Sequence, residues 1–93
     1  MCGIYGEISL VNSQVNRIEF TQALDRLEKR GPDSSGTFFK ENIALGHRRL
    51  SIIDLNSGDQ PMFDNTKQLV IVFNGEIYNF LILRKELIEA GFT

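Results

Sequence analysis

Two strand-like segments separated by a very short turn are the feature that most constrains the fold of this chain. Residues 35–40 (SGTFFK) and 42–53 (NIALGHRRLSII) have the apolar and β-branched character of strands, and only the turn at 40–42 joins them. Strands that follow each other so closely pair as an antiparallel hairpin. Residues 2–10 (CGIYGEISL) and 68–73 (QLVIVF) predict further buried strands. We therefore expect mostly antiparallel sheets.

Two other segments have apolar residues at helical spacing. The first is 17–29, with Asn16 as its N-cap. The second is 80–90, with Asn79 as its N-cap and Gly91 just past its C-terminal end. Their expected apolar faces consist of Phe20, Ala23, Leu24 and Leu27 in the first helix, and of Phe80, Leu83, Leu87 and Ala90 in the second. Helices and strands in this order predict an α+β fold.

Turns and loops are expected between these elements. The sequence RGPD at 30–33 breaks the first helix, because proline disfavours helical geometry at the residue before it. Residues 54–67 are rich in Asp, Asn, Ser and Gly and predict a loop. Asn74-Gly75 is a turn signal, after which residues 76–78 can resume a strand.

The composition excludes several classes of protein. The chain has 93 residues, enough for one small domain, and its single cysteine precludes an intramolecular disulfide. A formal net charge of -2 and a pI of about 5.3 argue against nucleic acid or an anionic membrane as partner. No apolar run has the length of a membrane span, and the N-terminus lacks the pattern of a signal peptide. A reducing cytoplasm is the expected location.

Cys2 is the most informative residue for chemistry. Its side chain is small enough to permit removal of Met1, which would expose a cysteine with a free α-amine. An α-amine has an unperturbed pKa of about 8, so it can take the thiol proton near neutral pH, directly or through a water. The alternative is a small buried residue at the start of a strand.

Asn74-Gly75 also has two interpretations. On its own the dipeptide is a hairpin turn. In an active site, the Asn74 side-chain amide and the Gly75 backbone N–H can converge on one developing negative charge and form an oxyanion hole.

Two consecutive arginines follow the only histidine. Arg48 and Arg49 point to opposite faces of a strand, so at most one of them can share the face of the site and bind a carboxylate there. Composition alone does not choose between them. His47 has no partner at metal-ligand spacing, which predicts a structural or strand-surface role and no metal site. The sequence also lacks a phosphate-binding glycine loop, so nucleotide chemistry is not expected in these residues.

The motifs taken together resemble a known family. The chain carries MCGI at 1–4, RGPDSSG at 30–36, HRRLSIIDL at 47–55, QPM at 60–62 and NGEIYN at 74–79. In this order they resemble the class II glutamine amidotransferases, which are N-terminal-nucleophile hydrolases, and most closely the glutamine-hydrolysing asparagine synthetase branch. The resemblance spans essentially the whole chain.

The resemblance implies a fold and a set of roles. The fold would be part of an αββα sandwich of mostly antiparallel sheets, with the 30–33 turn near the active site. Cys2 would attack the side-chain amide of L-glutamine, with its α-amine as base. The other implied site residues are Asn74 and Gly75 in the oxyanion hole, Arg49 on the α-carboxylate, Glu76 near the α-amino group, and Leu50, Ile52 and Ile53 lining the pocket.

The resemblance also implies what these 93 residues would lack. They would be the N-terminal portion of a glutaminase domain, because the family's next motif, with a further substrate-binding aspartate, would follow Thr93. On this resemblance the synthetase domain would lie outside these residues, and ATP and Mg²⁺ are expected only there. Uncovered strands and apolar faces would favour a homo-oligomer or a completing synthetase partner. The alternative is a non-catalytic truncated fragment that self-associates.

Overall fold

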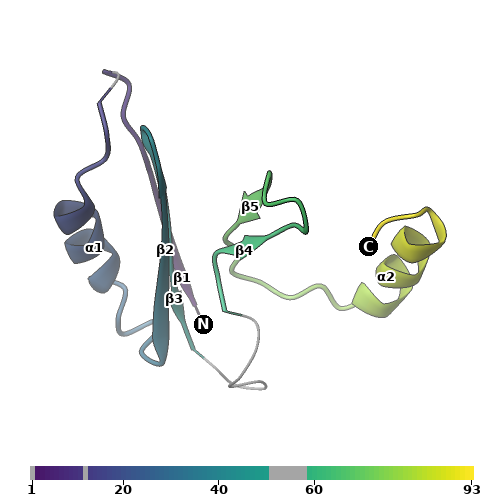
Figure 1. Ribbon diagram of the computed structural model, residues 1–93. Helices are drawn as coiled ribbons and strands as arrows, with labels where there is room; N and C mark the ends of the chain where they lie inside the picture. The colour runs from purple at the N-terminus through teal and green to yellow at the C-terminus, as the bar shows by residue number, and fades with distance from the viewer. Residues whose placement is uncertain (1, 12, 51–58) are drawn as a thin grey trace.

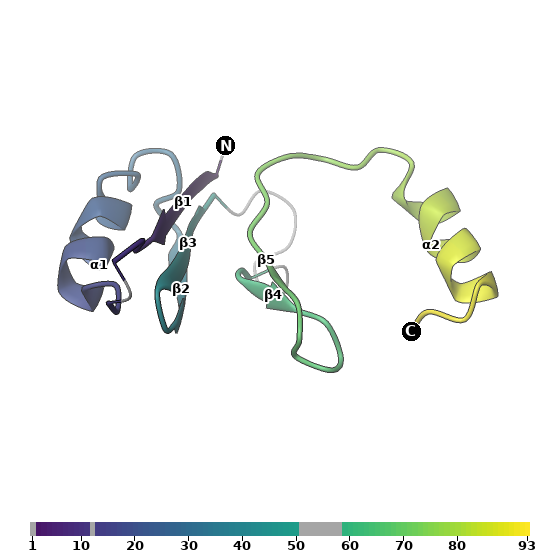
Figure 2. The same ribbon diagram turned by 90° about the horizontal axis from the view of Figure 1, so that it is seen from above.

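The computed structural model describes residues 2–11, 13–50 and 59–93. Its elements in chain order are β1 (Gly3–Ile8), α1 (Arg17–Asp25), β2 (Ser34–Lys40), β3 (Ile43–Arg49), β4 (Met62–Phe63), β5 (Val70–Ile71) and α2 (Phe80–Glu89). Figure 1 shows α1 against one face of the larger sheet and the β4–β5 pair on the other side, with α2 further out. The view from above in Figure 2 gives the same order of layers.

The larger sheet has the strand order β1-β3-β2, and both pairings are antiparallel. The predicted hairpin is confirmed as β2 and β3, which turn at Glu41 with a positive φ of 54°. Gly3 pairs with Arg48, and Ser34 pairs with Arg49. The last residues of β3 therefore have neighbours on both sides, from the start of β1 and the start of β2.

The hydrophobic core lies between α1 and the larger sheet. The Asn16 side chain accepts a hydrogen bond from the backbone N–H of Glu19 at 3.0 Å, which confirms the predicted N-cap. Phe20 and Leu24 are almost fully buried and pack against Ala44 and Gly46 of β3. The Phe20 ring also packs against those of Tyr5 and Phe39, at centroid distances of 4.8 and 5.3 Å.

The helix ends at Asp25, four residues before its expected end. Tighter i→i−3 hydrogen bonds replace the helical pattern there: the N–H of Arg26 donates to the Ala23 carbonyl at 3.2 Å and that of Leu27 to the Leu24 carbonyl at 2.9 Å. Beyond this turn the chain runs back towards β3. The expectation of a buried first strand is also only half correct, because β1 is an edge strand that leaves Ile4 and Ile8 exposed.

The second sheet differs from expectation. β4 and β5 pair antiparallel, and each is two residues long. β4 lies inside the stretch 54–67 that was predicted as a loop. Residues 54–58 of that stretch fall outside the described residues. The predicted strand at 68–73 is reduced to Val70–Ile71. No strand forms at 76–78, and Asn74-Gly75 is not a hairpin turn, because the chain leaves the sheet after β5 and runs on to α2.

The second helix is confirmed at Phe80–Glu89, with Gly91 following at a φ of 97°. Asn79 occupies the N-cap position but makes no capping hydrogen bond through its side chain. Every residue of α2 is exposed, so its apolar face is not covered by any described part of the chain.

The two helices and the two antiparallel sheets make the fold α+β, as predicted. Within the described ranges, neither helix is long and apolar enough to cross a membrane.

Candidate active site

The candidate site lies at the C-terminal end of β3, where Cys2 meets Leu50. The Cys2 Sγ atom accepts a hydrogen bond from the backbone N–H of Leu50 at 3.4 Å and lies 4.0 Å from the Leu50 carbonyl. Cys2 is half-buried and its thiol is free. Because β1 and β3 are antiparallel, the second residue of the chain is placed beside the residue that follows β3. Of the implied site residues, Cys2 and Leu50 are therefore in contact.

The RGPD turn supports this end of β3. Arg48 Nε donates to the Gly31 carbonyl at 2.9 Å, and the Asp33 N–H donates to the Arg49 carbonyl at 2.9 Å. A Cβ atom at Gly31 would lie 2.3 Å from the carbonyl carbon and oxygen of Arg48, so only glycine permits this approach. Arg30 Nε reaches the Cys2 carbonyl at 3.4 Å. The turn thus lies next to Cys2 and the C-terminal end of β3.

Arg48 and Arg49 lie on opposite faces of the sheet, as strand alternation predicted. Arg48 Nη1 forms an ion pair with Asp25 of α1 at 3.2 Å. Arg49 faces away from α1, and its Nη1 forms an ion pair with Asp59 at 2.9 Å. Gly3 pairs with Arg48 across β1 and β3, and side chains alternate along each strand. Cys2, one residue before Gly3, therefore shares the face of Arg49. The structure therefore puts Arg49, and not Arg48, on the face of the candidate nucleophile.

The chain from Asp59 to Phe63 covers this face of the sheet. A Cβ atom at Gly36 of β2 would lie 2.0 Å from the Gln60 carbonyl oxygen, so the glycine makes room for this segment. Gln60 Oε1 accepts a hydrogen bond from the backbone N–H of Phe73. Further along, the Phe38 and Phe63 rings meet edge to face at a centroid distance of 5.6 Å. Gln60, which precedes β4, and Phe63 within β4 therefore both contact β2 of the larger sheet.

His47 lies on the same face as Arg49 and is 1% exposed. Burial lowers the pKa of His47, and the nearby charge of Arg49 lowers it further, whereas the backbone of Phe73 and the charge of Asp59 act in the opposite direction. Its Nε2 atom has no hydrogen-bond partner among the described residues. The imidazole is therefore a neutral, buried group beneath the site. The predicted structural role fits this position, while a strand-surface position does not.

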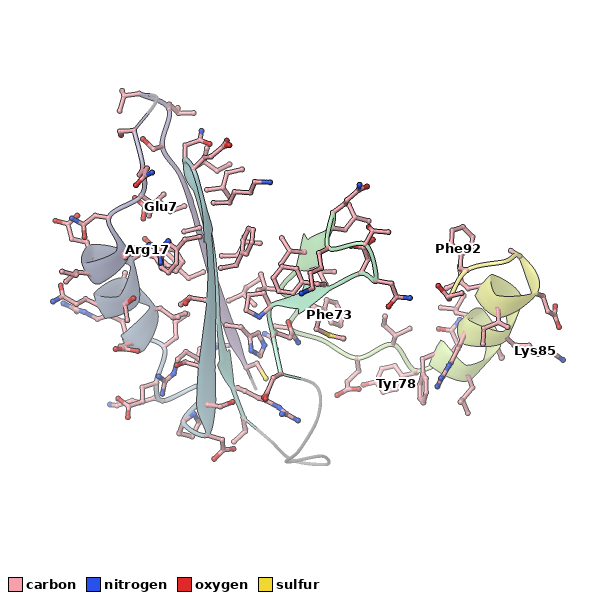
Figure 3. The ribbon with its side chains drawn as sticks, viewed as in Figure 1. Glu7, Arg17, Phe73, Tyr78, Lys85 and Phe92 are labelled. Carbon is pink, nitrogen blue, oxygen red and sulfur yellow. The ribbon has the colours of Figure 1, made fainter. Side chains whose placement is uncertain are left out.

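The remaining implied site residues are not brought to Cys2. Asn74, Gly75 and Glu76 are exposed on the connection between β5 and α2. Figure 3 shows this connection leaving the sheet, with Phe73 close to the β4–β5 pair and Tyr78 beside α2. Within the described residues, no hydrogen bond joins Cys2 to Asn74, Gly75 or Glu76. Ile52 and Ile53 lie outside the described residues.

Asp59 and Gln60 were not foreseen as parts of the site. Both lie inside the polar run at 54–67 that was predicted as a loop, and only Gln60 belonged to one of the quoted motifs. Their positions depend on contacts with β2 and β3 that are remote in sequence. In residues 2–11, 13–50 and 59–93, no group of three or more His, Cys, Asp and Glu side chains is placed to hold a metal ion.

Comparisons with known proteins agree with the motifs. The sequence profile of a glutamine amidotransferase domain matches residues 1–93. The chain is 46% identical over 88 residues to "Asparagine synthetase [glutamine-hydrolyzing] 2" of Arabidopsis thaliana, which covers 94% of this chain and 15% of that protein. It is 41% identical over 96 residues to "Asparagine synthetase [glutamine-hydrolyzing] 1" of Bacillus subtilis, covering 100% of this chain and 15% of the relative. It is 42% identical over 87 residues to "Asparagine synthetase B [glutamine-hydrolyzing]" of Escherichia coli, covering 92% of this chain and 16% of the relative.

Proposed function

Because this chain belongs to the glutamine amidotransferase domain family, we propose that it hydrolyses the side-chain amide of L-glutamine to glutamate and ammonia, with Cys2 as the nucleophile. The observation that carries this proposal is the contact of Cys2 Sγ with the Leu50 N–H, one residue after Arg49. A nucleophile and a carboxylate-binding cation are then side by side at one end of a strand. This arrangement would hold the α-carboxylate of glutamine on the same face as the nucleophile.

In the proposed first step, the Cys2 thiol loses its proton to the α-amine left by removal of Met1, and Sγ bonds to the amide carbon of glutamine. The tetrahedral intermediate collapses as the C–N bond breaks, and the protonated α-amine returns its proton to the leaving nitrogen, which departs as ammonia. A γ-glutamyl thioester remains on Cys2. Water then attacks the thioester, and glutamate and the free thiol are released.

The negative oxygen of the tetrahedral intermediate needs donors, and we assign these to the Asn74 side-chain amide and the Gly75 N–H. The role requires the segment after Phe73 to lie over Cys2. The hydrogen bond from the Phe73 N–H to Gln60 supports this assignment, because it ties the beginning of that segment to the face that carries Arg49.

Substrate binding completes the proposal. Arg49 binds the α-carboxylate of glutamine through its guanidinium, and Glu76 lies near the α-amino group. Leu50, Ile52 and Ile53 line the pocket for the aliphatic part of the side chain. The half-buried position of Leu50 against Cys2 supports its part in this lining.

The released ammonia has a proposed use. The relatives are named as glutamine-hydrolysing asparagine synthetases, and the chain spans about 15% of their length. We propose that ammonia feeds an ATP- and Mg²⁺-dependent amidation in a synthetase domain or partner chain. The described residues offer neither a metal-ligand cluster nor a phosphate-binding glycine loop for that step. Because Cys2 must stay reduced to act as a nucleophile, we propose the cytoplasm as the location.

The test is the intact mass of the protein before and after exposure to an electrophilic glutamine analogue. We expect loss of Met1 and one covalent adduct, which is absent in Cys2→Ala and prevented by excess L-glutamine. Retention of Met1, or an unmodified Cys2 in a folded protein, would refute the proposed nucleophile.

A second function is favoured by the exposed apolar surface of α2. Five large apolar side chains of α2 are at least half exposed to solvent: Phe80, Leu81, Ile82, Leu87 and Ile88. Apolar surface of this extent is typical of association between chains. On this alternative the chain is non-catalytic and self-associates. It requires a dimer or larger species by sedimentation at micromolar concentration together with no adduct at Cys2, whereas a reactive monomer rules it out.

A further inference from the structure

The ion pair between Arg49 and Asp59 places a carboxylate on the guanidinium that the proposed function assigns to the substrate. Arg49 Nη1 and Asp59 Oδ1 are 2.9 Å apart. The α-carboxylate of glutamine presents the same chemical group to the same cation. Two carboxylates cannot both take the strongest position on one guanidinium, so the substrate and Asp59 are in competition for Arg49.

We propose that Asp59 is an internal competitor of glutamine, which occupies the substrate-carboxylate position on Arg49 until the substrate displaces it, and thereby sets the affinity of the site. The proposal rests on the function proposed above, since it takes Arg49 as the carboxylate-binding residue. It adds that a residue of the chain itself weakens substrate binding.

The burial of the two partners explains why Asp59 is the one that leaves. The side chain of Arg49 is 11% exposed and that of Asp59 is 73% exposed. Arg49 is held by β3, and its backbone carbonyl is fixed by the N–H of Asp33. Separating Asp59 from Arg49 changes the hydration of its carboxylate little, because most of its surface already faces solvent. Displacement therefore moves an exposed side chain and leaves the buried arginine in place.

Asp59 is also held near Arg49 by contacts that do not involve the ion pair. The next residue, Gln60, lies directly over Gly36 of β2, and the Gln60 side chain accepts the Phe73 N–H. The backbone at Asp59 is therefore expected to stay in position when its carboxylate is removed or displaced. A high local concentration of the competing carboxylate follows from this tethering.

Asp59→Asn isolates the competing charge, because asparagine has almost the same shape. We expect the KM for L-glutamine in the intact protein to fall about two- to fivefold, which is the range expected for an ion pair whose carboxylate is mostly exposed to solvent. The dissociation constant of the product L-glutamate should fall by a similar factor. The difference between wild type and Asp59→Asn should shrink at high salt, and it should vanish for a substrate whose α-carboxylate is replaced by a carboxamide.

The matched control is Asp25→Asn. It removes the same charge from the neighbouring arginine on the opposite face, where Asp25 pairs with Arg48 at 3.2 Å, and it should leave KM unchanged. A KM that rises or stays constant in Asp59→Asn overturns the proposal and gives Asp59 a supporting role instead.

Arg49→Lys separates this failure from that of the proposed function. If Arg49→Lys raises KM while Asp59→Asn does not lower it, Arg49 binds the substrate but Asp59 does not compete. If Arg49→Lys has no effect on KM, the assignment of Arg49 is wrong, and the competitor proposal falls with it.

Discussion

Arg48 and Arg49 are consecutive residues of one strand, yet each forms an ion pair with an aspartate on a different face of the sheet. Arg48 reaches Asp25 of α1 at 3.2 Å, and Arg49 reaches Asp59 at 2.9 Å. Strand geometry alone imposes this division, because successive side chains point to opposite faces. One arginine is thereby available to join the helix to the sheet, and the other faces the site.

The division predicts opposite phenotypes for two matched variants. Arg49→Gln should raise the KM for glutamine at least about tenfold, because a lost charge-assisted hydrogen bond costs roughly 1.5–3 kcal/mol. Arg48→Gln should leave KM unchanged and lower the free energy of unfolding by about 1–2 kcal/mol, since it loses Asp25 and the Gly31 carbonyl. Steady-state kinetics and urea unfolding of both variants provide the measurement, and a rise in KM for Arg48→Gln would contradict the assignment.

Asn74→Ala tests the oxyanion hole. Removing one donor to the tetrahedral intermediate should lower kcat by roughly 100- to 1000-fold, with a much smaller change in KM, because the donor acts on charge that exists only in the transition state. Glutamate release under saturating glutamine measures this.

Asn79→Ala is the control for that experiment. Asn79 lies on the same connection, at the start of α2, and its side chain makes no capping hydrogen bond. Its substitution should leave kcat close to that of the wild type. Equal effects of the two substitutions would mean that the connection matters as a whole and that Asn74 has no specific role.

The elements that could be predicted from the sequence are those fixed by neighbouring residues. The hairpin of β2 and β3 follows from two β-prone segments joined by a short turn. Asn16 has an extended backbone, with φ −72° and ψ 113°, and its side chain accepts a hydrogen bond from the N–H of Glu19, three residues further along the chain. Asn79 has the same residue type but φ −98° and ψ 29°, outside the extended region, and its side chain does not cap. Residue type alone could not distinguish these two positions.

The features that could not be predicted depend on residues far apart in the chain. β4 is only two residues long and forms through its pairing with β5. Its own residues give no strand signal, and the polar residues around it predicted a loop. The pairing of Arg49 with Asp59 and the burial of His47 depend on how the segment at 59–63 crosses the sheet. Strand alternation did place His47 and Arg49 on one face, and that signal could have predicted their common surroundings.

The close packing of the RGPD turn on β3 predicts the effect of a single methyl group. In Gly31→Ala, the new Cβ would lie 2.3 Å from backbone atoms of Arg48, which cannot move aside as a side chain can. We expect a loss of about 1–3 kcal/mol in the free energy of unfolding, the usual cost of overpacking. Denaturant unfolding of the intact protein measures the change.

Gly6→Ala is the matched control on β1. Its Cβ would meet only ordinary contacts, 3.6 Å to Leu45 and 3.7 Å to the Ala44 carbonyl. The substitution should therefore be neutral or slightly stabilising, because alanine has less conformational freedom to lose on folding. If both variants lost the same stability, the special packing of Gly31 would be refuted.

Burial of His47 predicts a dependence of stability on pH. Burial, as the largest cause, lowers the pKa of His47 in the folded protein below its ordinary value of 6.5, so the unfolded chain binds the proton more tightly. Stability should therefore be complete above about pH 6.5 and should fall as the pH drops through the unfolded and then the folded pKa. His47 is the only histidine, so the part of the loss between pH 7.5 and 5.5 that disappears in His47→Gln can be assigned to it. Urea unfolding across this range should show the decrease in wild type and a flatter profile in His47→Gln, and a wild-type protein that gains stability on acidification would contradict the argument.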